Sequence, residues 1–109
     1  MTDRADLLQG TLDLLVLKSL QLEPLHGWGI SRRIRQLSRD MLQVTQGSLY
    51  PALYRLEDQK LVSATWGVSA EGRRAKFYRL TARGHKRLAA EREGWLRFVG
   101  AVAHVLEAD

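Results

Sequence analysis

One short stretch in the middle of the chain carries the side chains best suited to specific hydrogen bonding. Residues 45–59 place Leu49, Leu53 and Leu56 at the spacing of an apolar helix face, so an α-helix is predicted here. The rest of the helix surface offers hydrogen-bond donors and acceptors: Gln46, Ser48, Tyr50, Tyr54 and Arg55. Such a face is able to read the edges of DNA bases, although many amphipathic helices merely turn their polar side to water.

Pro51 sets the expected start of this helix. Proline is tolerated in the first turn, where the backbone N–H groups have no partner within the helix. We therefore expect the helix to begin near Gly47 or Ser48.

The remaining reactive side chains do not form an arrangement suited to catalysis or metal binding. His26, His85 and His104 lie far apart in the sequence and lack carboxylate neighbours at the spacing of metal ligands. The chain has no cysteine, and it contains neither a glycine-rich phosphate loop nor a G-x-S-x-G motif. The sequence therefore predicts a protein that is not an enzyme and needs neither cofactor nor metal.

Positive charge is concentrated in the second half of the chain. The formal net charge is +5, with acidic residues near the start (Asp3, Asp6, Asp13) and the end (Glu107, Asp109). Residues 71–92 hold 8 Lys/Arg against 2 Asp/Glu, a local net charge of +6. A polyanion such as nucleic acid is a natural partner for this segment, although basic surface helices are also common.

Two further helices are predicted ahead of the polar one. Residues 10–22 are rich in leucine and should be deeply buried, with Thr11 as the expected N-cap. Residues 26–38 place several arginines on an outward face, and only a short, partly apolar loop separates them from residue 45. Two helices joined in this way form a helix-turn-helix, whose second helix reads the major groove of DNA.

The pattern changes from helical to extended after Lys60. Residues 61–66 are rich in β-branched and aromatic side chains, and residues 73–80 alternate charged with apolar ones. A glycine-flanked turn joins them, which predicts a two-stranded hairpin whose return strand carries Arg73, Arg74 and Lys76. A lone hairpin is marginal in water, so it should lean on the helices as a wing.

A long helix should complete the chain, from a cap at Thr81 to about Ala108. Some 27 residues would span roughly 40 Å, more than the width of the preceding domain. Its second half carries an apolar stripe: Trp95, Phe98, Val99, Val102, Val105 and Leu106. We expect this stripe to pair with a second copy in a two-fold homodimer; the alternative is that the helix folds back on the first helix.

These elements predict an α+β fold that is mostly α. Residues 1–80 should form a winged helix-turn-helix DNA-binding domain with three helices and a two-stranded β-wing, and residues 81–109 the dimerisation helix. No apolar run approaches the roughly 20 residues of a membrane span, and the polar first residues do not resemble a signal peptide. We therefore expect a cytoplasmic protein without a membrane partner.

Four segments of the chain resemble the PadR family of transcriptional regulators. They are residues 8–13, 26–30, 47–57 and 74–81, and the resemblance covers residues 7–90 in the family's order. The short C-terminal part is similar to the smaller subfamily, which has a single helix after the wing. The resemblance implies a winged helix-turn-helix, homodimerisation through the last helix and, usually, repression of nearby genes. Family members often respond to aromatic compounds, and some regulate efflux transporters.

The resemblance also implies roles for individual residues. Ser48, Tyr50 and Pro51 lie where the family's recognition helix begins, and the basic wing corresponds to a region used against the phosphate backbone or the minor groove. In some small members a tryptophan of the last helix stacks on planar ligands at the dimer interface. Trp95 lies in a comparable place. We favour the alternative that Trp95 is simply the largest side chain in the core of the dimer interface. Trp28 replaces the tyrosine of the family's H-G-Y motif and is expected to fill the core.

The predicted elements and the resemblance together indicate a homodimeric repressor that binds a pseudo-palindromic operator in double-stranded DNA. The resemblance alone implies, as a further option, a small planar aromatic effector. Gln46, Ser48 and Arg55 are the expected contacts to bases, unless Arg55 holds a phosphate or pairs with Asp58 or Glu57. A winged-helix module for protein interaction is the main alternative, but it would leave the cationic hairpin unexplained. RNA binding is weakly supported, since no platform of aromatic residues on a sheet is evident.

Overall fold

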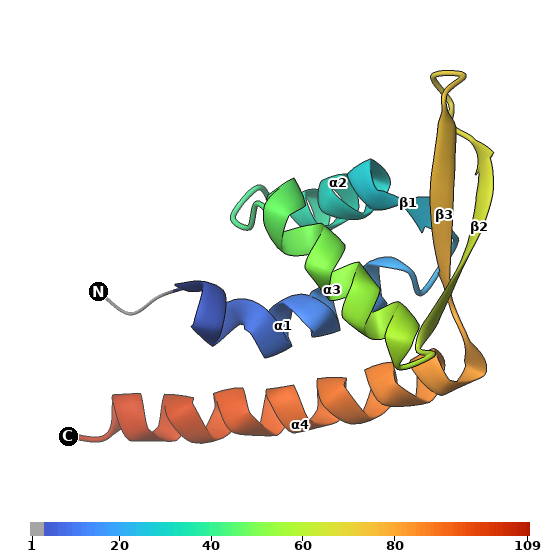
Figure 1. The fold of residues 1–109 in the computed structure, drawn as a ribbon. Helices are drawn as coiled ribbons and strands as arrows, with labels where there is room; N and C mark the ends of the chain where they lie inside the picture. Colours follow the sequence, from blue (N-terminus) through green and yellow to red (C-terminus); the bar gives the residue numbers. More distant parts are fainter. Residues whose placement is uncertain (1–3) are drawn as a thin grey trace.

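A helical cluster, a projecting β-hairpin and one long helix make up the protein (Figure 1). A computed structural model describes the backbone of residues 4–109 and the side chains of residues 10–109. Asp3, and the side chains of Asp6, Leu8 and Gln9, lie outside the described part. The elements are α1 (Arg4–Ser19), β1 (Leu25–His26), α2 (Gly27–Leu37), α3 (Gln46–Asp58), β2 (Val62–Val68), β3 (Arg74–Leu80) and α4 (Ala82–Glu107). This order confirms the predicted mostly helical, winged helix-turn-helix fold with a long C-terminal helix.

Two helix starts differ from the prediction. Helix α1 begins at Arg4, so Thr11 lies within the helix and is not its cap. Helix α3 begins at Gln46, where Thr45 Oγ1 accepts a hydrogen bond from the Ser48 backbone N–H at 3.2 Å. Pro51 therefore lies in the second turn, where the helix gives up one backbone hydrogen bond. The cap at Thr45 determined the start of α3 more strongly than the proline did.

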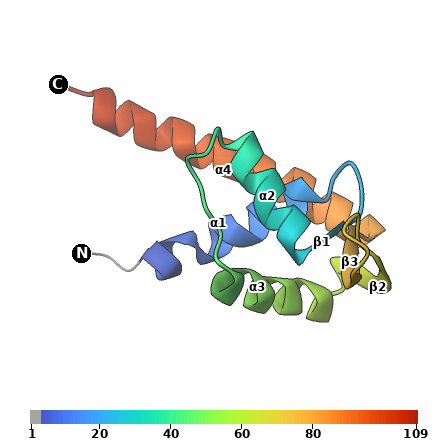
Figure 2. The same ribbon diagram turned by 90° about the horizontal axis from the view of Figure 1, so that it is seen from above.

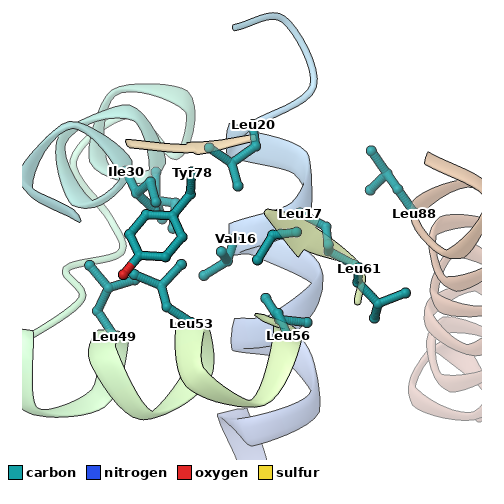
Figure 3. Packing of buried hydrophobic residues seen from close by; sticks show 12 residues of the cluster. Val16, Leu17, Leu20, Ile30, Leu49, Leu53, Leu56, Leu61, Tyr78 and Leu88 are labelled. Atoms are coloured by element: carbon teal, nitrogen blue, oxygen red, sulfur yellow. The ribbon is translucent and has the colours of Figure 1, made fainter. Parts of the chain in front are cut away.

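The core is built from aliphatic side chains of α1, α2 and α3 and closed by the sheet (Figure 3). Helix α1 lies between α3 and α4 in both ribbon views (Figure 2), which explains why its leucine-rich surface is buried on more than one side. The fully or nearly buried members are Val16, Leu17, Leu20, Ile30, Ile34, Leu49, Leu53, Leu56, Leu61, Val62, Tyr78 and Leu88. The predicted stripe of α3 at 49, 53 and 56 is therefore its core face.

The sheet has one strand more than predicted. Strands β2 and β3 form the expected antiparallel hairpin, with Val62 opposite Leu80 and Val68 opposite Arg74. The short strand β1 pairs with the other edge of β3, with Leu25 opposite Tyr78, which gives the order β1-β3-β2. This pairing ties the start of α2 to the wing and stabilises a hairpin that would be marginal alone.

Helix α4 is anchored at the base of the wing. Thr81 caps it as predicted, since its Oγ1 accepts a hydrogen bond from the Gly84 N–H at 3.0 Å, and the same hydroxyl donates to the Lys60 carbonyl at 2.8 Å. A Cβ added at Gly84 would lie 2.0 Å from the carbonyl oxygen of Leu61, so helix and chain meet there with no room for a side chain. Leu88, one turn further on, reaches the core (Figure 3).

This contact predicts that Gly84→Ala lowers the free energy of unfolding by about 2–3 kcal/mol, because a methyl group must displace backbone atoms. Gly94→Ala is the matched control in the same helix, since a Cβ there meets nothing within 4 Å. The control should instead gain about 0.5–1 kcal/mol from improved helix propensity. Urea unfolding of both variants measures the difference, and an equal effect at the two positions would contradict the close packing.

Candidate nucleic-acid interface

The first half of α3 is exposed on the side away from the core. Gln46, Ser48, Tyr50, Pro51 and Tyr54 all have exposed side chains, so five of the six predicted contact residues of this helix are open to a partner. Thr45 Oγ1 donates to Ser48 Oγ at 3.1 Å, which orients the serine hydroxyl at the start of the helix. This surface offers hydroxyl, amide and aromatic groups together, as base and phosphate contacts require.

Tyr50 is held in place by the start of α2. A Cβ added at Gly27 would lie 2.6 Å from the Tyr50 hydroxyl oxygen, so the missing side chain of Gly27 makes room for the phenol ring. The close contact joins the exposed face of α3 to α2. The sequence indicated Tyr50 as a residue of the polar helix face but gave no sign of its contact with Gly27.

Arg55 has a different place from the other members of the predicted set. Its Nη2 lies 2.8 Å from Asp13 Oδ1 of α1, and the two side chains are only 32% and 25% exposed. The sequence offered Asp58 and Glu57 as carboxylate partners, whereas the actual partner is 42 positions away along the chain. Because an ion pair between helices leaves no period in the sequence, only the fold reveals this one. Arg55 therefore links α1 to α3 in the free protein.

The wing carries its positive charge in two different settings. Arg73 and Arg74 are exposed near the turn, and the Arg74 guanidinium lies over the Trp66 ring with 4.7 Å to its centroid. Lys76 lies nearer to α3, with Nζ 3.4 Å from Glu57 Oε1 and 5.7 Å from the Tyr78 ring centroid. The wing arginines are thus more available to a partner than Lys76. Trp66, 61% exposed, is a residue that sequence reasoning did not single out.

A groove of about 820 Å³ runs between the wing and the helices. It is lined by His26, Gly27, Trp28, Tyr50, Trp66, Ser69, Glu71, Arg73, Arg74, Ala75, Lys76 and Tyr78, among which three cations face one carboxylate. Burial raises the pKa of the Tyr78 hydroxyl, so this group stays neutral over the physiological pH range. The groove is therefore positive, partly aromatic and adjacent to the exposed face of α3.

Trp28 does not fill the core as expected. It lies at the start of α2 with 55% of its surface exposed, and it borders the groove beside the wing. The core next to α2 is filled instead by Ile30 and Ile34, which point inward from the same helix.

The predicted dimerisation residues lie along the distal part of α4. Helix α4 runs beside α1, and a second groove of about 460 Å³ between them is lined by Gly10, Thr11, Leu14, Arg87, Ala90, Glu91, Gly94, Trp95 and Phe98. Packing on α1 does not cover the stripe, however. Trp95, whose ring centroid is 6.1 Å from that of Phe98, remains 41% exposed, and all other members of the stripe are exposed as well: Phe98, Val99, Val102, Val105 and Leu106.

Two kinds of feature are missing from the part of the chain that the structure describes. No cluster of three His, Cys, Asp or Glu side chains there could hold a metal ion. None of its helices is long and apolar enough to cross a membrane.

Comparison with known proteins gives a consistent result. The family model of PadR-like transcriptional regulators matches residues 16–90, which is more than half of the chain. This chain belongs to the PadR-like family. A PadR-like regulator from Bacillus cereus is 26% identical with a TM-score of 0.80, over 95% of this chain and 99% of that one. A PadR-family regulator from Eggerthella lenta is 30% identical with a TM-score of 0.77, over 95% and 88%.

Two further similarities extend the comparison. A transcriptional regulator from Clostridium thermocellum is 25% identical with a TM-score of 0.81, over 91% of this chain and 96% of that one. An uncharacterized protein from Lysinibacillus sphaericus is 28% identical over 92 residues, or 84% of each chain. PadR-family members are DNA-binding transcriptional regulators and not enzymes, and this chain is one of them.

The Arg55–Asp13 pair predicts a measurable coupling between α1 and α3. In urea unfolding, the double variant Asp13→Ala/Arg55→Ala should lose about 1 kcal/mol less than the sum of the two single variants, because the pair is partly shielded from water. The exposed Glu93–Arg97 pair in α4 is a matched control, for which a coupling of about 0.3–0.5 kcal/mol is expected. Additive single losses at positions 13 and 55 would contradict the assignment of Arg55 as a link between helices.

Proposed function

We propose that this PadR-family regulator is a homodimeric repressor that binds a specific pseudo-palindromic operator. The observation that carries the proposal is the shared orientation of three features: the exposed face of α3, the exposed wing arginines and the positive groove between them. The hairpin projects beyond the helices beside α3 (Figure 1), as a wing that contacts DNA next to a recognition helix would. A polyanion fits this arrangement better than a neutral partner does.

In this proposal α3 enters the major groove with its N-terminal half. Gln46 and Ser48 are the expected contacts to base edges, since both are exposed at the end of the helix that would approach the bases. Tyr50, Pro51 and Tyr54 add phosphate and apolar contacts along the same face. Arg73 and Arg74 bind the backbone or the minor groove and supply mainly sequence-independent affinity. Lys76, which is paired with Glu57, contributes less.

Dimerisation through α4 would place two copies of α3 on one side of the DNA. The exposed apolar stripe that begins at Trp95 supports this pairing, because so much apolar surface on a projecting helix is unfavourable in water. Two recognition helices about 34 Å apart would meet successive major grooves. The proposal thus divides the chain into a DNA-binding part, residues 1–80, and a dimerisation helix, residues 81–109, in a protein that acts in the cytoplasm.

The groove between α1 and α4 is the proposed location of an effector site. Trp95 and Phe98 line it together with aliphatic and charged groups, which suits a small planar aromatic molecule. A molecule bound there would touch both α1 and the dimer helix. Release of the operator by such a molecule is therefore part of the proposal.

Fluorescence-anisotropy titration tests the proposed function. The full-length protein is titrated against duplex fragments from the region upstream of its own gene, at two salt concentrations, with unrelated DNA of equal length as the control. Tighter binding of one fragment at both salt concentrations supports a specific regulator. Equal, weak and strongly salt-dependent binding of all fragments would contradict it and favour a module for protein interaction.

Arg74→Ala should weaken binding of operator and unrelated DNA by a similar factor. Because Arg74 is expected to neutralise one phosphate, the slope of log affinity against log salt should become about one unit shallower. The same titrations at several salt concentrations provide the measurement. A loss of operator preference with an unchanged slope would assign this arginine to a base and overturn its proposed role.

A further inference from the structure

Helix α2 presents a second tryptophan–arginine stack at its first turn. Trp28 and Arg32 are one helical turn apart, and the Arg32 guanidinium carbon lies 5.3 Å from the Trp28 ring centroid. Both side chains are exposed, although a large indole normally gains free energy by being buried. An exposed indole that holds a cation in place is a feature the fold itself does not require.

The charge of Arg32 is not compensated within the described part of the chain. Its neighbours on α2 have carboxylate partners: Arg33 lies 3.2 Å from Glu23, and Arg35 lies 3.3 Å from Asp40. No carboxylate among the described residues lies within ion-pair distance of Arg32. The cation–π attraction holds the guanidinium group near the indole face, and no carboxylate of the described residues engages its N–H groups, which leaves them available to an anion.

The position of the stack connects it to the proposed DNA surface. A groove of about 490 Å³ lies between α2 and the segment that leads into α3, and it is lined by Trp28, Ser31, Arg32, Arg35, Gln43 and Val44. Trp28 also lines the groove beside the wing. The two grooves therefore share Trp28, so the surface around the start of α3 continues from the wing onto α2.

We infer that the Trp28–Arg32 stack is an additional contact site for the phosphodiester backbone of DNA. The Arg32 guanidinium binds phosphate oxygens of the strand that flanks the major groove occupied by α3, and Trp28 is the positioning residue that orients it. The first helix of a helix-turn-helix crosses the backbone in this way. This inference rests on the proposed DNA-binding function and extends the contact surface to α2.

A double-mutant cycle on DNA affinity tests the inference. Arg32→Ala should weaken the binding of operator and unrelated duplexes alike and make the salt slope about one unit shallower. Trp28→Leu should lower affinity about twofold to fivefold with little change in slope, since the charge remains but is no longer held in place. Trp28→Leu should have no further effect in the Arg32→Ala background, and Trp28→Phe should restore most of the affinity.

Lys18→Ala is the matched control, because it removes one positive charge from an exposed site on α1 that belongs neither to the proposed DNA surface nor to the dimerisation helix. Its affinity and salt slope should equal those of the unaltered protein, and thermal unfolding checks that every variant is folded. If Arg32→Ala behaves like this control, the stack does not touch DNA and the inference is wrong. An equal loss from Trp28→Leu with and without Arg32 would contradict the positioning role.

The Trp28–Arg32 stack could instead bind a small free anion such as inorganic phosphate. If Arg32→Ala leaves DNA binding unchanged but abolishes thermal stabilisation by inorganic phosphate at constant ionic strength, the site binds small anions and the inference is overturned. Failure of the proposed function looks different. The unaltered protein would then bind all duplexes equally, while the slope change caused by Arg32→Ala would still be measurable on any of them.

Discussion

The contact between Gly84 and the Leu61 carbonyl sets the direction in which α4 leaves the domain. No side chain separates helix and backbone there, and the Thr81 hydroxyl fixes the same corner through the Lys60 carbonyl. A long helix amplifies any angular change at its base, so a small shift at this corner would move the distal apolar stripe by many ångströms. Because the proposed dimer forms through that stripe, the spacing between two copies of α3 depends on this one packed junction.

A second constraint joins the parts of the proposed DNA surface to one another. Strand β1 pairs with β3, so the residues that precede α2 belong to the same sheet as the wing. His26 connects the two elements. Its Nδ1 caps α2 by accepting a hydrogen bond from the Gly29 N–H at 3.0 Å, and its ring packs on Phe77 of the wing with 5.2 Å between the ring centroids. Tyr50 in turn packs on Gly27. The wing, α2 and α3 are therefore held in one arrangement before any partner binds, which favours affinity by reducing the entropy lost on binding.

Features with a local cause were predictable from the sequence, whereas features with a distant partner were not. The leucine periods of α3, the alternation of β3 and the cap at Thr81 each follow from neighbouring residues. The two residues of β1 are too few to leave a period, and they form a strand only because β3 offers a free edge. The exposure of Trp28 likewise depends on how α2 meets the core. Most members of the candidate site were predicted from the sequence, but neither stack was. The Trp66–Arg74 stack joins two strands and depends on their register, whereas Trp28 and Arg32 are one helical turn apart and their contact could have been found from the helical spacing.

Specific binding in the proposed function depends on two recognition helices acting together on one face of DNA. Hydroxyl-radical footprinting of the full-length protein on its upstream fragment tests this most directly, because it reports which sugars are covered at single-nucleotide resolution. We predict two protected tracts related by a two-fold axis, with centres about 10–10.5 base pairs apart and on one face of the duplex. A single unpaired tract, or uniform weak protection along the whole fragment, would contradict the proposed dimeric arrangement.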